Sequence, residues 1–73
     1  MVAYFVKYYG DKPVLVKMES SGKLNQSSDT KAYVFRDGKY IESPYHVTQV
    51  LYGGEYDEIS KEEADGIAGA VND

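Results

Sequence analysis

The stretch VAYFVKYYGDKPVLVKME, residues 2–19, decides the fold of this 73-residue chain. Residues 2–9 are rich in β-branched and aromatic side chains, which favour a β-strand, and residues 14–19 repeat the pattern. Gly10 and Pro13 lie between them and favour a turn, because Gly tolerates positive φ and Pro fixes its own φ. We therefore predict an antiparallel hairpin. Since both faces of residues 2–9 are largely apolar, this strand is expected to be central or covered on both sides.

A second hairpin is predicted over residues 32–42. Residues 32–36 alternate as a strand, and residues 39–42 return as another. Asp37 and Gly38 lie between them, and this dipeptide is typical of a two-residue type I′ turn, which needs positive φ at both positions. The hairpin would place Tyr33 and Tyr40 on neighbouring strands, where cross-strand aromatic pairs contribute roughly 0.2–1 kcal/mol.

Two short helices are predicted after the hairpins. Ser43 and Pro44 suit the N-cap and the first helical position. An apolar stripe with helical spacing follows them, formed by Val47, Val50 and Leu51. The second helix begins at Ser60, where the S-x-x-E spacing to Glu63 is typical of a capping box. Its apolar stripe is formed by Ala64, Ile67, Ala68 and Val71.

These elements predict one α+β domain spanning residues 1–73. The expected architecture is a small antiparallel sheet of two β-hairpins, about four strands, with two short C-terminal helices packed on one face. A four-stranded meander is preferred, and a half-open barrel is the alternative. Residues 20–30, SSGKLNQSSDT, are rich in Ser, Asn, Asp and Gly. We expect them to form a flexible loop, which is either functional or merely disordered.

The composition excludes several kinds of chemistry. The chain has no Cys, so it has no thiol nucleophile, disulfide or thiolate metal site, which fits a cytoplasmic protein. Its start lacks the pattern of a signal peptide, and no apolar run approaches the roughly 20 residues of a membrane span. The spacings of an EF-hand and of a P-loop are also missing. No cofactor, metal site or membrane partner is expected.

The charge pattern bears on the partner. Eight Lys and Arg against twelve Asp and Glu give a net charge of −4. The cationic residues are scattered from Lys7 to Lys61 without the basic cluster of a nucleic-acid binder, so a nucleic-acid partner is not expected. An acidic surface instead suits solubility or a basic protein partner.

Tyrosine is unusually frequent, with eight Tyr against two Phe and no Trp. Tyr is enriched at protein interfaces because it combines an apolar ring with a polar tip. The alternative is that the rings lie half-buried along the sheet edges with their hydroxyls in water. Seven residues are therefore the interaction candidates: Tyr4, Tyr8, Tyr9, Tyr33, Tyr40, Tyr45 and His46.

The favoured function is a small non-catalytic protein-interaction module that uses a Tyr-rich sheet surface or the 20–30 loop. One alternative is a small enzyme or ligand-binding subunit centred on His46 with Tyr45 and Glu42. The helical pattern places His46 off the apolar stripe, however, and predicts a solvent-exposed side chain. Another alternative is an acidic nucleic-acid mimic or an inhibitor of a basic protein.

The small size of the chain favours self-association. A core of this size has little reserve stability. Two helices on one face of a sheet would leave aromatic rings exposed on the other face, and a twofold pairing of such faces would bury them. The partner is therefore expected to be another protein or a second copy in a homodimer.

Overall fold

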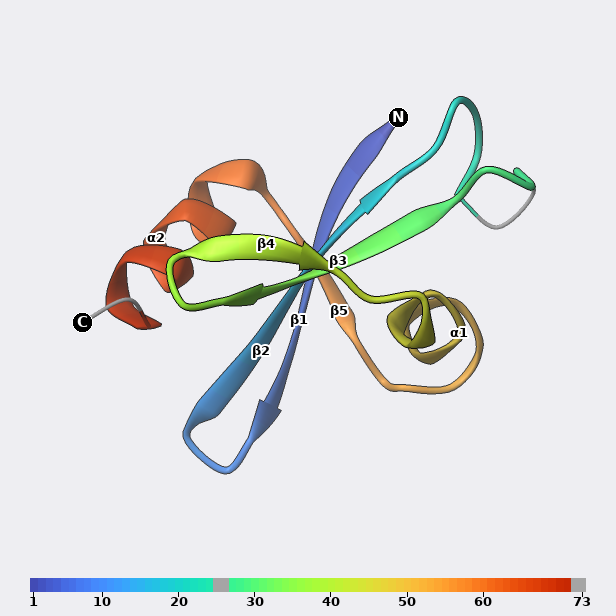
Figure 1. Ribbon diagram of the computed structural model, residues 1–73. Coiled ribbons are helices and arrows are strands. Elements are labelled where there is room, and N and C mark those ends of the chain that lie inside the picture. The colour runs from blue at the N-terminus through green and yellow to red at the C-terminus, as the bar shows by residue number, and fades with distance from the viewer. Residues whose placement is uncertain (25–26, 72–73) are drawn as a thin grey trace.

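A computed structural model describes residues 1–24 and 27–71 of the chain (Figure 1). Within these residues, five strands form one antiparallel sheet: β1 (Val2–Tyr9), β2 (Lys12–Glu19), β3 (Lys31–Arg36), β4 (Lys39–Glu42) and β5 (Asp57–Ile59). Two helices, α1 (Tyr45–Tyr52) and α2 (Lys61–Val71), complete the α+β fold. Neither helix, within these described ranges, has the length and apolar composition needed to span a bilayer.

The predicted meander is present, and a fifth strand extends it. The strand order is β4-β3-β2-β1-β5. Strand β5 pairs with β1, so that Tyr4 lies opposite Ile59 and Val6 lies opposite Asp57. Strand β1 thus has a neighbour on each side, as its two apolar faces predicted. The sheet is open, with β4 and β5 at its edges, and the half-open barrel is not formed.

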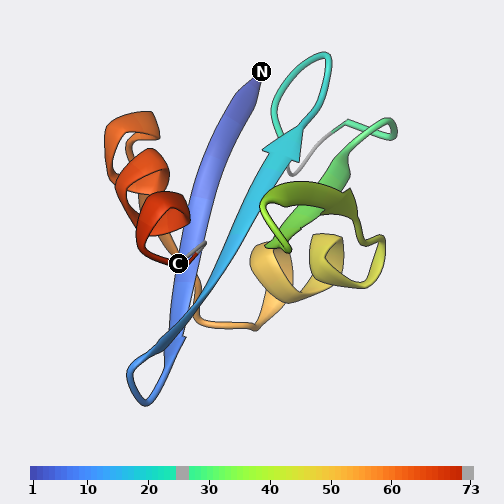
Figure 2. The ribbon, with the colours of Figure 1, turned by 60° about the vertical axis from the view of Figure 1, so that its left-hand side comes forward.

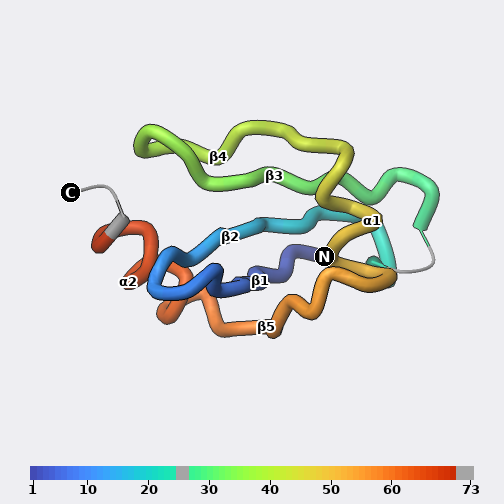
Figure 3. Tube along the Cα trace, turned by 90° about the horizontal axis from the view of Figure 1, so that it is seen from below, coloured from blue at the N-terminus to red at the C-terminus, as the bar shows by residue number. Residues whose placement is uncertain are grey.

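Both hairpin turns contain two residues. They lie at the same end of the sheet, and α1 lies toward the other end (Figure 3). Asp37 and Gly38 have φ of 52° and 80°, as the predicted tight turn requires. In the first hairpin, Tyr9 pairs with Lys12. Strand β2 therefore begins two residues before its predicted start.

The two helices pack on opposite faces of the sheet, so the prediction that both lie on one face is wrong (Figure 2). One face, which we call the α1 face, carries the main buried cluster. This cluster consists of Ala3, Val16, Met18, Leu24 and Ala32. Helix α1 covers it with the predicted stripe of Val47, Val50 and Leu51.

The opposite face, the α2 face, carries the alternate residues of the same strands. Val6 and Leu15 pair across β1 and β2, and they are 4% and 2% exposed. Helix α2 contacts both strands, and its Ala64 is fully buried. The prediction failed because both faces of the first hairpin are apolar and each face needs its own cover.

The loop between β2 and β3 is anchored to the core. Leu24 belongs to the main buried cluster. The hydroxyl of Thr30 donates a hydrogen bond to the carbonyl of Leu24 at 2.8 Å. Residues 25–26 of the predicted loop lie outside the described residues, and the flexibility of the loop stays a prediction.

The capping box predicted for α2 is confirmed. The backbone N–H of Glu63 donates to Ser60 Oγ at 3.1 Å, and the N–H of Ser60 donates to Glu63 Oε1 at 3.4 Å. Glu62 and Glu63 also place negative charge in the first turn, where the helix dipole stabilises it.

We expect Ser60→Ala to lower the free energy of unfolding by about 0.5–2 kcal/mol, because the amide of Glu63 loses its side-chain acceptor. Urea unfolding followed by circular dichroism measures this change. Ser28→Ala, at an exposed loop position, is the control and should stay within about 0.5 kcal/mol of the unsubstituted protein. Equal losses for the two variants would contradict the cap.

Gly38→Ala and Gly66→Ala are expected to change stability in opposite directions. Gly38 has φ of 80°, where a Cβ atom costs roughly 1–2 kcal/mol. Gly66 lies within α2, and a Cβ atom added there meets nothing within 4 Å. Ala at this position should therefore stabilise the helix by about 0.5–1 kcal/mol. Thermal unfolding midpoints that shift in the same direction would contradict this assignment.

Candidate functional site

The predicted interaction residues divide between the two faces of the sheet. Side chains alternate along a strand, so the strand pairing fixes their faces. Tyr4, Tyr8, Tyr33 and Tyr40 belong to the α2 face. Tyr9 belongs to the α1 face, and helix α1, which covers part of this face, carries Tyr45 and His46.

On the α2 face, Tyr33 and Tyr40 gather around Lys17. The ammonium of Lys17 lies 5.1 Å from the ring centre of Tyr33 and 4.9 Å from that of Tyr40. Lys17 Nζ is also 3.2 Å from a carboxylate oxygen of Glu19. The ring of Tyr40 lies edge-on to that of Phe35, with 5.1 Å between their centres. This cluster fits half-buried tyrosines that stabilise the sheet by cross-strand packing.

Tyr40 is the most constrained member of this cluster. Its hydroxyl is buried and has no hydrogen-bond partner among the described residues. Burial raises the pKa of Tyr40, and the nearby Tyr4 hydroxyl and Asp65 carboxylate add to this effect. The side chain therefore stays neutral and packs as a large apolar ring.

On the α1 face, a row of rings and one ammonium runs from α1 to the end of β1. The ring of His46 lies edge-on to Tyr45 and to Tyr56, with 5.5 Å and 6.5 Å between ring centres. Lys7 Nζ lies 6.0 Å from the ring centre of Tyr56 and 5.2 Å from that of Tyr9. The row joins β1 to α1 and to the segment between α1 and β5, which are far from β1 in the sequence.

His46 is half-buried within this row, so the prediction of a solvent-exposed His46 is wrong. Its Nδ1 lies 2.6 Å from Ser43 Oγ, which is hydrogen-bonding distance. Burial lowers the pKa of His46, and the positive charge of Arg36 lowers it further. Glu42, expected beside His46 in the enzyme alternative, pairs with Tyr33 and belongs to the α2 face.

The surroundings of His46 therefore include no carboxylate among its described contacts. An acid–base histidine is normally oriented by a third group and acts on a nucleophile or metal-bound water. Within the part of the chain that the structure describes, no three His, Asp or Glu side chains are grouped to hold a metal ion.

Four cationic side chains belong to the α1 face near the hairpin turns. They flank the two turns: Lys7 and Lys12 belong to the first hairpin, and Arg36 and Lys39 to the second. Together with their apolar neighbours they define a surface that we call the open face. It comprises Lys7, Lys12, Arg36, Lys39, Tyr9, Val14, Ile41 and Tyr56.

The sequence hides the grouping of the four cations because they are separated by up to 32 positions, from Lys7 to Lys39. Two features of the sequence point to it, however. The residues on either side of a two-residue turn pair directly, so Tyr9 faces Lys12 and Arg36 faces Lys39. The two residues of such a pair lie on the same face of the sheet. Because side chains alternate along each strand, the turn then fixes the face of every other residue in its hairpin. The four cations are scattered in the sequence, and the strand pairing places them on one face of the sheet.

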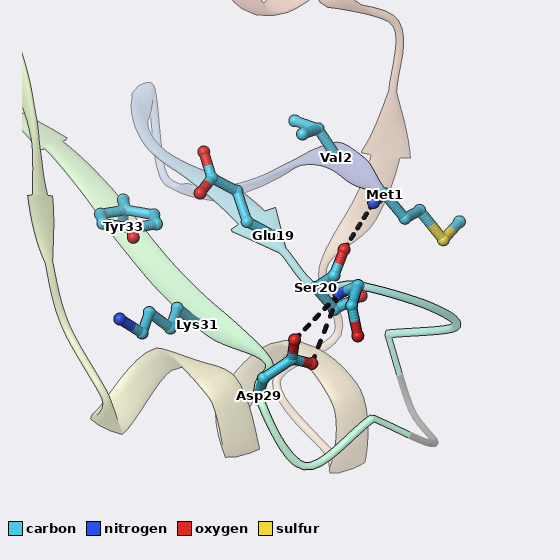
Figure 4. A pocket seen from close by; sticks show the side chains of 8 residues that line it. Met1, Val2, Glu19, Ser20, Asp29, Lys31 and Tyr33 are labelled. Atoms are coloured by element: carbon cyan, nitrogen blue, oxygen red, sulfur yellow. Dashed lines mark hydrogen bonds between the residues drawn. The ribbon is translucent and has the colours of Figure 1, made fainter.

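A hollow of about 590 Å³ lies at the other end of the sheet, between the start of β1 and the 20–30 loop (Figure 4). The backbone N–H of Ser21 donates to both carboxylate oxygens of Asp29, at 3.3 and 3.2 Å. These hydrogen bonds lower the pKa of Asp29. The ammonium of Met1 donates to the carbonyl of Ser20. The polar groups here are thus used to hold the loop against the strands.

Comparison of the chain with protein-family models, with curated proteins and with solved structures found no match. The geometry and charge of the surfaces described above are therefore what bears on function.

We expect His46 to titrate with a midpoint below its ordinary value of 6.5, because burial and the Arg36 guanidinium disfavour the imidazolium. NMR of the His46 ring proton measures the midpoint. Arg36→Ala should raise it, whereas Lys31→Ala, on the α2 face, should leave it unchanged. A midpoint at or above 6.5, or equal shifts in the two variants, would contradict the placement of Arg36.

The same lowered pKa predicts how stability depends on pH. The folded-state pKa of His46 lies below its unfolded value of about 6.5, so the unfolded chain binds the proton more readily. Neutral His46 contributes to the free energy of unfolding. This contribution is fully present above a pH of about 6.5 and is lost as the pH falls through the folded-state pKa. The free energy of unfolding, measured between pH 7 and pH 5, should therefore decline less with falling pH in His46→Gln than in the unsubstituted protein. The same pH dependence in both proteins would contradict the lowered pKa of His46.

Proposed function

We propose that this chain is a small, non-catalytic protein-interaction module that binds its partner through the open face. The observation that carries the proposal is the exposure of large side chains on this side of the sheet. Tyr9, Tyr45 and Ile41 are 58%, 68% and 39% exposed. We retain the cytoplasmic location expected from the lack of Cys as part of the proposal.

The residue types on the open face support a protein partner. Tyr and Arg are enriched at protein interfaces and supply much of their binding energy. The position of Lys7 between Tyr9 and Tyr56 also matters. Cation–π contacts of about 0.5–1 kcal/mol at exposed sites restrict these side chains before binding, so less conformational entropy is lost when the partner arrives.

The surroundings of His46 favour this proposal over the enzyme alternative. Two tyrosine rings and the hydroxyl of Ser43 surround the imidazole. This environment orients the ring through packing, and it supplies no carboxylate among the described contacts to stabilise an imidazolium during proton transfer. We therefore assign His46 to the support of Tyr45 and Tyr56 at the border of the open face.

Self-association through the open face is opposed by charge. A twofold pairing of this face would bring its four cations against the same four of a second copy. The acidic residues Glu62, Glu63 and Asp65 belong to α2, on the opposite face, so pairing them with the open face would join copies head to tail without closing a dimer. The homodimer stays a prediction that the charge distribution opposes, and we propose a different protein as the partner.

We expect the unsubstituted protein to capture a partner from an extract of the organism that encodes it, and Tyr9→Ser to lose that partner. The substitution keeps a hydroxyl and removes the ring. Tyr8→Ser is a matched control, because Tyr8 is adjacent in sequence, is 56% exposed and lies on the α2 face. Mass spectrometry of the captured proteins measures the outcome. Equal capture by the two variants would contradict the assignment of the open face.

A further inference from the structure

We infer that the open face recognises an acidic protein segment that carries apolar side chains between its carboxylates. The inference rests on the proposed function and specifies the chemistry of the partner.

The first support is that the four cations of the open face are available. Among the residues that the structure describes, the ion pairs join Lys17 to Glu19 and Lys61 to Asp65. Neither pair involves a cation of the open face. A partner carboxylate would therefore meet these cations without displacing an existing ion pair.

The second support is that the cations lie on the same face of both hairpins. Lys39 pairs with Arg36 across β3 and β4, and Lys7 pairs with Val14 across β1 and β2. The pairing of β2 with β3, which runs from Val16 with Val34 to Glu19 with Lys31, joins the two hairpins in one sheet. Side chains at alternate positions of an extended segment point to the same side, so carboxylates at these positions would all face the cations.

The third support is the apolar surface beside these cations. Val14 pairs with Lys7 and is only partly buried, and Ile41 is exposed two residues from Lys39 on the edge strand. Tyr9 extends the surface toward the first turn. Apolar side chains of a partner would gain burial here, whereas a chain of phosphates would leave this surface in water.

The local charge favours a protein segment over a nucleic acid. Asp11 and Asp37 lie in the turns, and Glu58 lies on the same face at the edge strand β5. Four cations and three nearby carboxylates leave a local surplus of one positive charge. The whole chain carries −4, so a long polyanion would be repelled beyond the contact area. A short acidic segment contacts the cations and does not extend beyond the contact area, so it avoids most of the repulsion from the negative charge of the chain.

The opposite side of the molecule would orient such a segment. Helix α2 presents Glu62, Glu63 and Asp65 on the other face of the sheet. This separation of charge attracts an acidic segment to the open face and repels it from the α2 face. It steers association and disfavours reversed docking.

The experiment uses a fluorescein-labelled peptide of sequence Gly-Asp-Leu-Asp-Phe-Asp-Leu-Gly and fluorescence anisotropy with the full chain. Arg36→Glu/Lys39→Glu should weaken binding about tenfold or more, because two attractive contacts become repulsive. Lys23→Glu/Lys31→Glu is the matched control, with the same change in net charge at two exposed lysines outside the open face. It should stay within about threefold of the unsubstituted protein, because screening weakens distant charges.

Further probes and variants separate the possible outcomes. A peptide with Ser in place of Leu and Phe should bind more weakly, and Lys12→Glu provides a second variant at the other hairpin turn. Bound peptide should also raise the His46 titration midpoint, because its carboxylates offset the charge of Arg36. Circular dichroism melts confirm that each variant is folded.

Equal weakening in the two double variants would overturn the inference, as would equal affinity for the Ser-containing peptide. Tighter binding of twelve-nucleotide oligo-dT that is lost in Arg36→Glu/Lys39→Glu would assign the face to nucleic acid. Absence of peptide binding, with Tyr9-dependent capture still observed, would overturn the acidic segment and leave the proposed function standing. Absence of both would overturn both.

Discussion

The paired strands β1 and β2 are apolar on both of their faces, and the rest of the molecule is arranged to cover them. Removal of apolar surface from water is the dominant favourable term in folding, at roughly 25 cal/mol per Å². Val6 and Leu15 face one side of this hairpin, and Val16 and Met18 face the other. A single layer of helices would leave one of these sets in water, so the chain must place a helix on each side.

The edge strand β5 allows this arrangement. Helix α1 ends on one face, and β5 then runs along the edge of the sheet beside β1 before α2 begins on the other face (Figure 2). The helices have 8 and 11 residues, so each covers only part of its face. The uncovered part of the α1 face lies near the hairpin turns, where the cations and Tyr9 are found. The open face is thus a consequence of covering a two-sided hairpin with two short helices.

Local chemistry predicted much of this fold. The Asp37-Gly38 turn, the apolar stripe of α1 and the Ser60–Glu63 capping box depend on residues that are close in sequence, and each is present. The faces of the helices could not be predicted in the same way. The alternation in β1 and β2 defines two apolar faces, but only the path of the chain decides which helix covers which face.

The missed features share this dependence on distant partners. Strand β5 has three residues, too few to show alternation, and it forms because the edge of β1 is free to pair. His46 lies off the helical stripe and is half-buried because Tyr56, ten residues later, packs against it. The cationic cluster likewise requires the pairing of β2 with β3. The five tyrosines predicted on strands lie on those strands, whereas their division between two faces depends on the complete sheet.

The placement of the two helices on opposite faces of the β1–β2 hairpin can be tested directly. Methyl NOE spectroscopy on protein labelled at Ala, Leu and Met methyl groups provides this test. The structure predicts NOEs from Ala64 to Leu15 and, in the same sample, NOEs from Leu51 to Met18. NOEs from Ala64 to Met18, with none to Leu15, would place both helices on one face and contradict the account.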